Sequence, residues 1–109
     1  MKKLLVALLM VPTMAHAEFF TGNDLLTRLQ ASTYTEKSQG LGYIQGVFDV
    51  TQGWGHCAPN DRGITAGQIQ DMVLQSLLAN PATRNLTADQ LVLNVLKARW
   101  PCANRGRGA

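Results

Sequence analysis

Residues 1–17 have the three-part pattern of a secretory signal peptide. Two lysines precede an apolar run at residues 4–11, and the segment ends in the small-x-small sequence Ala-His-Ala. The apolar run is too short to cross a bilayer, because a membrane helix needs about 20 apolar residues. We therefore expect this segment to be removed on export. The mature chain would start near Glu18 as one small domain without a membrane anchor.

The charge of the exported part is close to balanced. The sequence holds 10 Lys and Arg against 7 Asp and Glu, and removing Lys2 and Lys3 leaves 8 basic residues against 7 acidic ones. Two of these bases, Arg105 and Arg107, lie in the Gly/Arg-rich segment 103–109, whose composition predicts disorder. A nearly neutral body gives no electrostatic reason to expect a nucleic-acid partner.

Cys57 and Cys102 are the two cysteines of the chain. In the oxidising compartment that an exported protein enters, such a pair usually forms a disulfide. The bond would stabilise so small a domain by about 4 kcal/mol. A metal site would need more ligands than these cysteines and His56 can offer. A Cys–His nucleophile is also disfavoured, since a histidine adjacent in sequence is poorly placed to direct its ring at the sulfur.

Apolar residues recur at helical spacing, and no strand-like alternation appears. The pattern predicts an all-α fold, a small bundle of about four helices linked by one disulfide. The first helix opens at Thr21 or Asn23, and a polar connection at residues 31–39 separates it from a second helix at about 38–54. Three leucines share one side of the first helix: Leu25, Leu26 and Leu29.

Two capping boxes mark the starts of the third and fourth helices. The third starts at Thr65 to Gln68 and should end near Asn80, because the following proline disfavours helical geometry before it. The fourth starts at Thr87 to Gln90 and ends at Trp100. The expected core positions are Ile69, Met72, Val73, Leu74, Ser76, Leu77, Leu78, Leu91, Val92, Val95, Leu96 and Trp100.

The second helix has two contrasting sides. Its wide apolar face comprises Tyr43, Ile44, Val47, Phe48, Val50, Thr51 and Trp54. The opposite side carries Gly42, Gln45, Gly46 and Asp49. A glycine inside a helix costs about 1 kcal/mol relative to alanine, so the two glycines suggest that something packs closely there. The neighbour is either another helix of the same chain, which we favour, or a second subunit.

The sequence lacks recognisable catalytic chemistry. It has no Gly-rich phosphate loop before a helix, no His-x-x-x-His pair and no Gly-x-Ser-x-Gly elbow. Its carboxylates are scattered along the chain, and nothing indicates that two of them converge in a cleft. We therefore expect neither an enzyme, nor a metal site, nor a cofactor.

Five segments, in order, resemble the Tai/Rap immunity family. They are residues 42–49 (Gly-Tyr-Ile-Gln-Gly-Val-Phe-Asp), 57–59 (Cys-Ala-Pro), 64–68 (Ile-Thr-Ala-Gly-Gln), 77–81 (Leu-Leu-Ala-Asn-Pro) and 91–102, which ends Trp-Pro-Cys. Together they cover most of the chain from about Gly22 to Cys102, so residues 18–102 are expected to form the immunity domain.

The resemblance implies a function and an assembly. Members of the family are small periplasmic proteins that neutralise peptidoglycan amidase toxins delivered by type VI secretion. It implies an all-helical homodimer that acts by occluding an amidase, with Cys57 and Cys102 in a structural role. The alternative function is a periplasmic stress or chaperone-like helical protein without a toxin partner. A mature chain with one histidine offers little acid-sensing chemistry for that alternative.

An inhibitor of this kind needs a rigid protruding segment with a few strong anchors. Two loops fit that description, one beside the disulfide and one between the third and fourth helices. Their residues are the partner-binding hypothesis: Asn60, Asp61, Arg62, Thr83, Arg84 and Asn85. The competing interpretation is that these are ordinary solvated turn residues.

Overall fold

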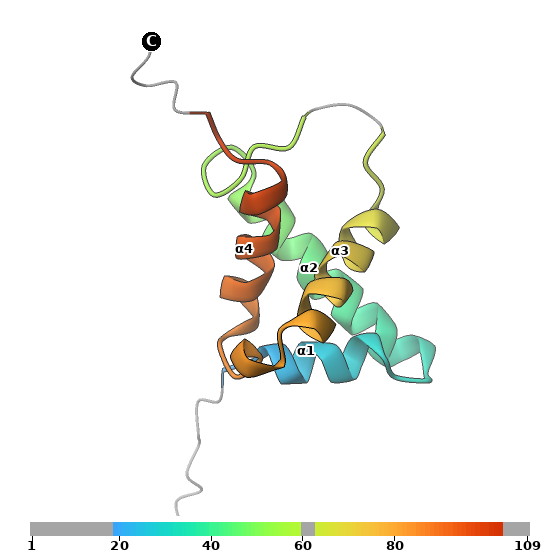
Figure 1. The fold of residues 1–109 in the computed structure, drawn as a ribbon. Coiled ribbons are helices and arrows are strands. Elements are labelled where there is room, and N and C mark those ends of the chain that lie inside the picture. The colour runs from blue at the N-terminus through green and yellow to red at the C-terminus, as the bar shows by residue number, and fades with distance from the viewer. Residues whose placement is uncertain (1–18, 60–62, 104–109) are drawn as a thin grey trace, which may run out of the picture.

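The computed structural model describes residues 19–59 and 63–103, which form an all-α domain (Figure 1). Its elements are α1 (Gly22–Leu29), α2 (Tyr34–Thr51), α3 (Ala66–Ala79), the short 3-10 helix η2 (Pro81–Thr83) and α4 (Ala88–Arg99). The predicted four-helix fold class is confirmed. The predicted signal peptide, the tail from residue 104 and the loop residues Asn60, Asp61 and Arg62 lie outside the described residues.

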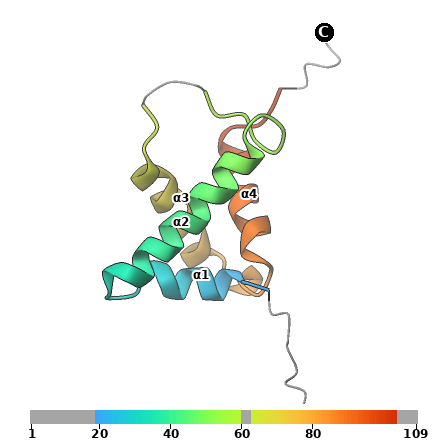
Figure 2. The same ribbon diagram turned by 180° about the vertical axis from the view of Figure 1, so that it is seen from behind.

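The long helix α2 runs obliquely along one side of the bundle, and α3 and α4 lie on its other side (Figures 1 and 2). Helix α1 crosses one end of the bundle and contacts all three other helices. The opposite end holds the turn after α2 and the end of α4. None of the described helices is long and apolar enough to cross a membrane.

Each helix contributes residues to one buried core. Its members are Leu25, Leu26, Leu29, Ile44, Ala58, Ile69, Val73, Leu77, Ala88, Val92, Leu96 and Trp100. The leucine side predicted for the first helix is therefore confirmed. The predicted core positions of the third and fourth helices are buried or partly buried except Leu78, which is 47% exposed. Leu78 lies one residue before the end of α3, and its side chain is open to solvent there although it shares the helical spacing of Leu74.

Side-chain caps fix the starts of two helices where the sequence predicts them. Thr21 and Asp24 form a reciprocal capping box at α1, and Thr65 and Gln68 form another at α3. Each box satisfies backbone N–H groups that have no partner inside the helix. Helix α3 ends at Ala79, as Pro81 predicts.

The predicted second capping box is wrong. Thr87 is the N-cap residue of α4, but its side chain makes no capping hydrogen bond. Its backbone instead forms an antiparallel bridge with Thr21, and the N–H of Ala88 donates to the carbonyl of Phe20 at 2.7 Å. The start of α4 is therefore held by the chain that precedes α1.

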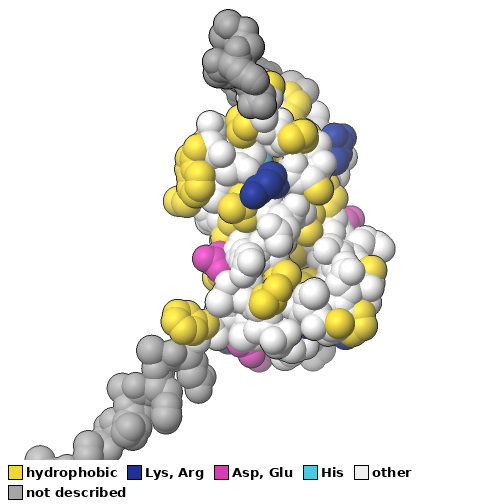
Figure 3. Space-filling model, turned by 60° about the vertical axis from the view of Figure 1, so that its left-hand side comes forward, with side chains coloured by type: hydrophobic (Ala, Val, Ile, Leu, Met, Phe, Trp, Pro, Cys, Tyr) yellow, Lys and Arg dark blue, Asp and Glu magenta, His cyan; other side chains and the backbone are white. Residues whose placement is uncertain are grey.

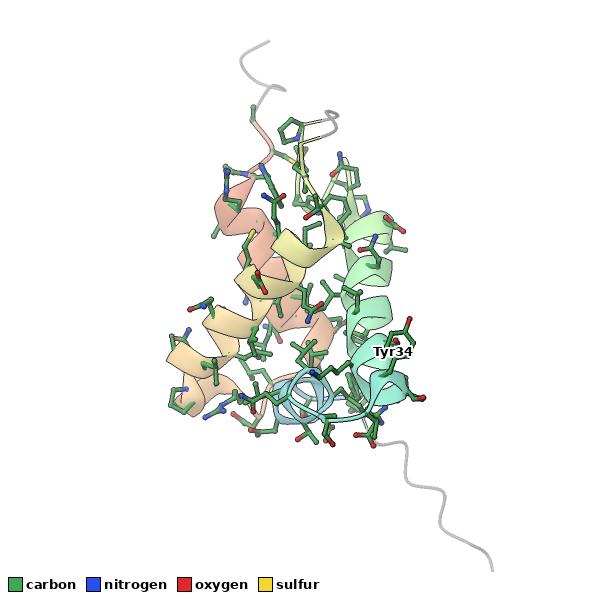
Figure 4. The ribbon with its side chains drawn as sticks, turned by 90° about the vertical axis from the view of Figure 1, so that its right-hand side faces the viewer. Tyr34 is labelled. Atoms are coloured by element: carbon green, nitrogen blue, oxygen red, sulfur yellow. A yellow bond between two sulfur atoms is a disulfide. The ribbon has the colours of Figure 1, made fainter. Side chains whose placement is uncertain are left out.

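The predicted bounds of the second helix also need correction. Helix α2 begins at Tyr34, inside the predicted connection, because the Thr33 side chain accepts from the N–H of Glu36 and caps the helix there. Tyr34 is 85% exposed and projects from the bundle (Figure 4). The helix ends at Thr51, earlier than predicted, and the turn that follows includes Gly53 at a φ of +96°.

The predicted disulfide is confirmed. Cys57 and Cys102 are bonded across 45 positions of sequence, with their Cα atoms 4.8 Å apart. The bond connects the loop between α2 and α3 to the residues that follow α4.

Candidate partner-binding surfaces

Residues 83–86, between α3 and α4, are held against the start of α1 by backbone hydrogen bonds, and we call them the pinned segment. The N–H groups of Gly22 and Asn23 donate to the carbonyls of Leu86 and Arg84, both at 2.9 Å. Gly22 permits this approach, because a Cβ there would lie 2.9 Å from the Arg84 carbonyl oxygen. The backbone of the predicted binding loop is thus anchored to another helix.

The three predicted side chains of this loop lie close together in sequence and differ in burial. Thr83 and Asn85 are exposed, whereas Arg84 is half-buried. The Nε atom of Arg84 is buried and has no hydrogen-bond partner among the described residues. A guanidinium can form paired hydrogen bonds with a carboxylate, and none of the described residues accepts from the buried Nε of Arg84.

The glycine side of α2 has open space beside it. A Cβ at Gly42 or Gly46 would meet no atom within 4 Å, and Asp49 is exposed. The expected packing of another helix of the same chain against this side is therefore wrong. In Figure 2, α2 lies in front of α3 and α4, and no helix covers the side of α2 that faces the viewer. A second subunit remains a proposal for this face.

Gln45 differs from its neighbours on that side. It is half-buried, and its Oε1 atom has no hydrogen-bond partner among the described residues. It lines a hollow of about 330 Å³ between α2 and α3, with Asp49 and Ile69 among the other lining residues. The polar side chains of the hollow are thus two amides, Gln45 and Gln52, and one carboxylate, Asp49, which is not a catalytic or metal-binding set.

Two large side chains that the sequence assigned to the apolar face are exposed. Val50 is 68% and Trp54 is 67% exposed. The indole N–H of Trp54 donates to the Val50 carbonyl at 2.8 Å, which fixes the ring and leaves an apolar surface. The position of Trp54 between Gly53 and Gly55 is a signal of a turn, and it could have shown that the residue lies outside the helix.

On the face that Figure 3 shows, hydrophobic side chains occur at several separate places. Besides Val50, Trp54, Tyr34 and Leu78, the exposed large hydrophobic residues include Phe19 and Leu86. Leu86 belongs to the same segment as Arg84, so that segment carries an exposed apolar side chain and a half-buried arginine.

Tyr43 belongs to α2, and its phenol lies near Asp89 of α4. Its ring packs against Phe20 with centroids 4.8 Å apart. Burial, and then the nearby carboxylate of Asp89, raise the pKa of the Tyr43 phenol above its usual value of 10.0. The phenol is thus neutral at physiological pH and acts as a packing group.

No group of three or more His, Cys, Asp or Glu that could hold a metal ion occurs within residues 19–59 and 63–103. A family model described as Rap1a immunity proteins matches residues 21–102. The chain belongs to the Rap1a immunity proteins.

The matched region of this Rap1a protein begins at the Thr21 cap and ends at Cys102, so it spans all four helices and the disulfide. This match confirms the membership of the immunity family that the resemblance of the sequence predicted. A comparison with curated proteins finds no significant match. Family membership gives the class of function, which is immunity against a toxin effector by protein–protein binding.

Proposed function

We propose that this Rap1a protein is a periplasmic immunity protein that binds and inhibits a peptidoglycan amidase delivered by type VI secretion. The observation that carries the proposal is the family match over residues 21–102. The target class comes from the resemblance of five ordered segments to immunity proteins of amidases. We expect no enzymatic activity of its own.

The proposed location has two supports. Residues 1–17 have the signal-peptide pattern, and the Cys57–Cys102 disulfide suits an oxidising compartment. N-terminal sequencing of the protein recovered from periplasm tests this part. It should start near Glu18, and an intact Met1 would contradict cleavage.

We place the main toxin contact on the pinned segment 83–86. Its backbone is held by two hydrogen bonds to α1, so little conformational entropy is lost on binding. Arg84 supplies a guanidinium whose Nε has no hydrogen-bond partner among the described residues, and Leu86 supplies exposed apolar area. Arginine is enriched among the residues that dominate interface energetics. Asn60, Asp61 and Arg62 are proposed as a second contact on sequence grounds alone.

We further propose a homodimer through the open side of α2. Gly42 and Gly46 leave room for a second helix to approach, and the family resemblance implies a dimer. Asp49 would lie at the edge of that contact. Sedimentation across a concentration series tests the assembly.

The function is tested by capture. The oxidised, exported protein is immobilised and exposed to candidate periplasmic amidases, and the bound enzyme is assayed for peptidoglycan cleavage. The expected result is one enzyme that binds tightly and loses activity. If a panel that includes any amidase encoded beside this gene shows neither binding nor inhibition, the amidase proposal is wrong and the chaperone-like alternative moves ahead.

A further inference from the structure

His56 is fully buried at the disulfide-linked end of the bundle, with 0% of its surface exposed. Its carbonyl accepts from the N–H of Gly53 at 2.7 Å, and the next residue, Cys57, donates to the Trp100 carbonyl at 2.8 Å. Its ring packs against Phe48, with centroids 4.5 Å apart, and lies 6.4 Å from the Trp100 ring. The imidazole therefore joins the end of α2 to the end of α4.

The hydrogen bonds of Thr51 fix the protonation of this ring. The Thr51 hydroxyl donates its one proton to the carbonyl of Val47 at 2.7 Å. The contact of 2.9 Å between Thr51 Oγ1 and His56 Nδ1 must then have Nδ1–H as its donor. In the neutral ring Nε2 consequently carries the lone pair, and it has no partner among the described residues.

The residues around Nε2 do not favour the addition of a second proton to the imidazole ring at that atom. The side chains that α2 and α4 place on the ring are Phe48 and Trp100. The nearby charged residues of these helices, Asp49, Lys97 and Arg99, are exposed. The Arg99 guanidinium lies over the Trp100 ring, 5.1 Å from its centroid, and adds positive charge on that side. A protonated Nε2 would be a buried donor without an acceptor.

We propose that His56 is an acid-sensitive lock: its neutral ring holds residues 53–57 onto the ends of α2 and α4, and protonation releases them. Burial lowers the pKa of His56 below its usual value of 6.5 in the native state. A histidine whose pKa is lower in the native state than in the unfolded chain contributes its full stabilisation at pH values above its pKa in the unfolded chain. That stability is lost as the pH falls below 6.5 toward the native pKa. The disulfide limits how far the released segment can separate.

The test compares unfolding of the exported, oxidised protein at pH 7 and pH 5. The unfolding constant should rise by up to about 25-fold, which is the limit for a histidine that stays neutral in the native state at both pH values and has a pKa of about 6.5 when unfolded. His56→Phe should remove most of this rise. Val73→Ala, which removes buried volume from α3, should lower stability but keep the rise. His56→Gln, also neutral at both pH values, replaces His56→Phe if the phenylalanine does not fold.

Two measurements on the unmutated protein locate the effect. The imidazole NMR signal of His56 should not titrate near pH 6.5 while the protein is folded. Amide-exchange protection at Gly53 and Cys57 should fall at pH 5 more than protection at Val73. Titration of the folded ring near pH 6.5, or an equal pH dependence in the His56 variants, overturns the proposal.

Discussion

The backbone N–H of Cys57 donates to the carbonyl of Trp100, with N and O 2.8 Å apart. Trp100 lies two residues before Cys102 in the sequence. The same end of the bundle is therefore held by a hydrogen bond and by the Cys57–Cys102 bond. One contact aligns the two backbones, and the other prevents their separation even when the fold opens. The first prediction follows from this pairing.

Replacing both cysteines, Cys57→Ser with Cys102→Ser, should lower the free energy of unfolding by about 4 kcal/mol, because the unfolded chain is no longer cross-linked. Urea denaturation of the variant and of the unmutated protein measures the difference. The unmutated protein with its disulfide reduced is the matched control and should lose a similar amount. A loss below about 1 kcal/mol in both would contradict the expected role of the cross-link.

The two predicted capping threonines should respond differently to alanine. Thr65→Ala removes a reciprocal capping box and should lower stability by about 1 kcal/mol. Thr87→Ala removes no capping bond, so its loss should be less than half as large. Chemical denaturation of the two variants side by side checks this difference. Equal losses would mean that Thr87 does cap α4 in solution.

Alanines on the open side of α2 should stabilise the monomer. Gly42→Ala and Gly46→Ala each meet empty space, so each should raise the unfolding free energy of the monomer by about 1 kcal/mol. Gly22→Ala is the contrasting control and should destabilise, since its Cβ would meet the Arg84 carbonyl. Unfolding curves at low protein concentration measure both effects.

The same glycine variants test the dimer. If a second copy packs on α2 at Gly42 and Gly46, added methyl groups should weaken self-association while they stabilise the monomer. Sedimentation equilibrium of the double variant separates these effects. A dimer of unchanged affinity would place its interface elsewhere.

Arg84 should be the strongest single contact with the toxin. Arg84→Ala should weaken binding by about 30-fold, which corresponds to a hot-spot loss of about 2 kcal/mol. Stability should fall by no more than about 1 kcal/mol, because the half-buried side chain loses some packing but no hydrogen bond from Nε to a described residue. Titration calorimetry with the captured amidase measures the affinity.

Lys97→Ala is the control for Arg84→Ala, because it removes one exposed positive charge from a different part of the surface. It should leave the affinity nearly unchanged. Arg62→Ala, measured in the same series, tests the second proposed contact. Equal effects of Arg84→Ala and Lys97→Ala would show that general charge, not the pinned segment, governs binding.

The start of α2 was within reach of sequence reasoning. Thr33 followed three residues later by Glu36 is a capping signal, and the Thr33 side chain does accept from the Glu36 N–H. The polar composition of residues 31–39 hid it, because few apolar residues mark the first two turns. The exposure of Val50 was not within reach, since it depends on where the other helices lie.

The sequence by itself determined the all-α class, the starts of α1 and α3, the end of α3 before Pro81 and the disulfide pair. These features depend on residues a few positions apart, or on the presence of two cysteines in an exported chain. Only the tertiary structure decided that the glycine side of α2 stays open and that Trp54 faces outward. It also decided that His56 is buried, with no hydrogen-bond partner for Nε2 among the described residues. Helical spacing shows which residues share a side, whereas the packing of distant segments decides which side is covered.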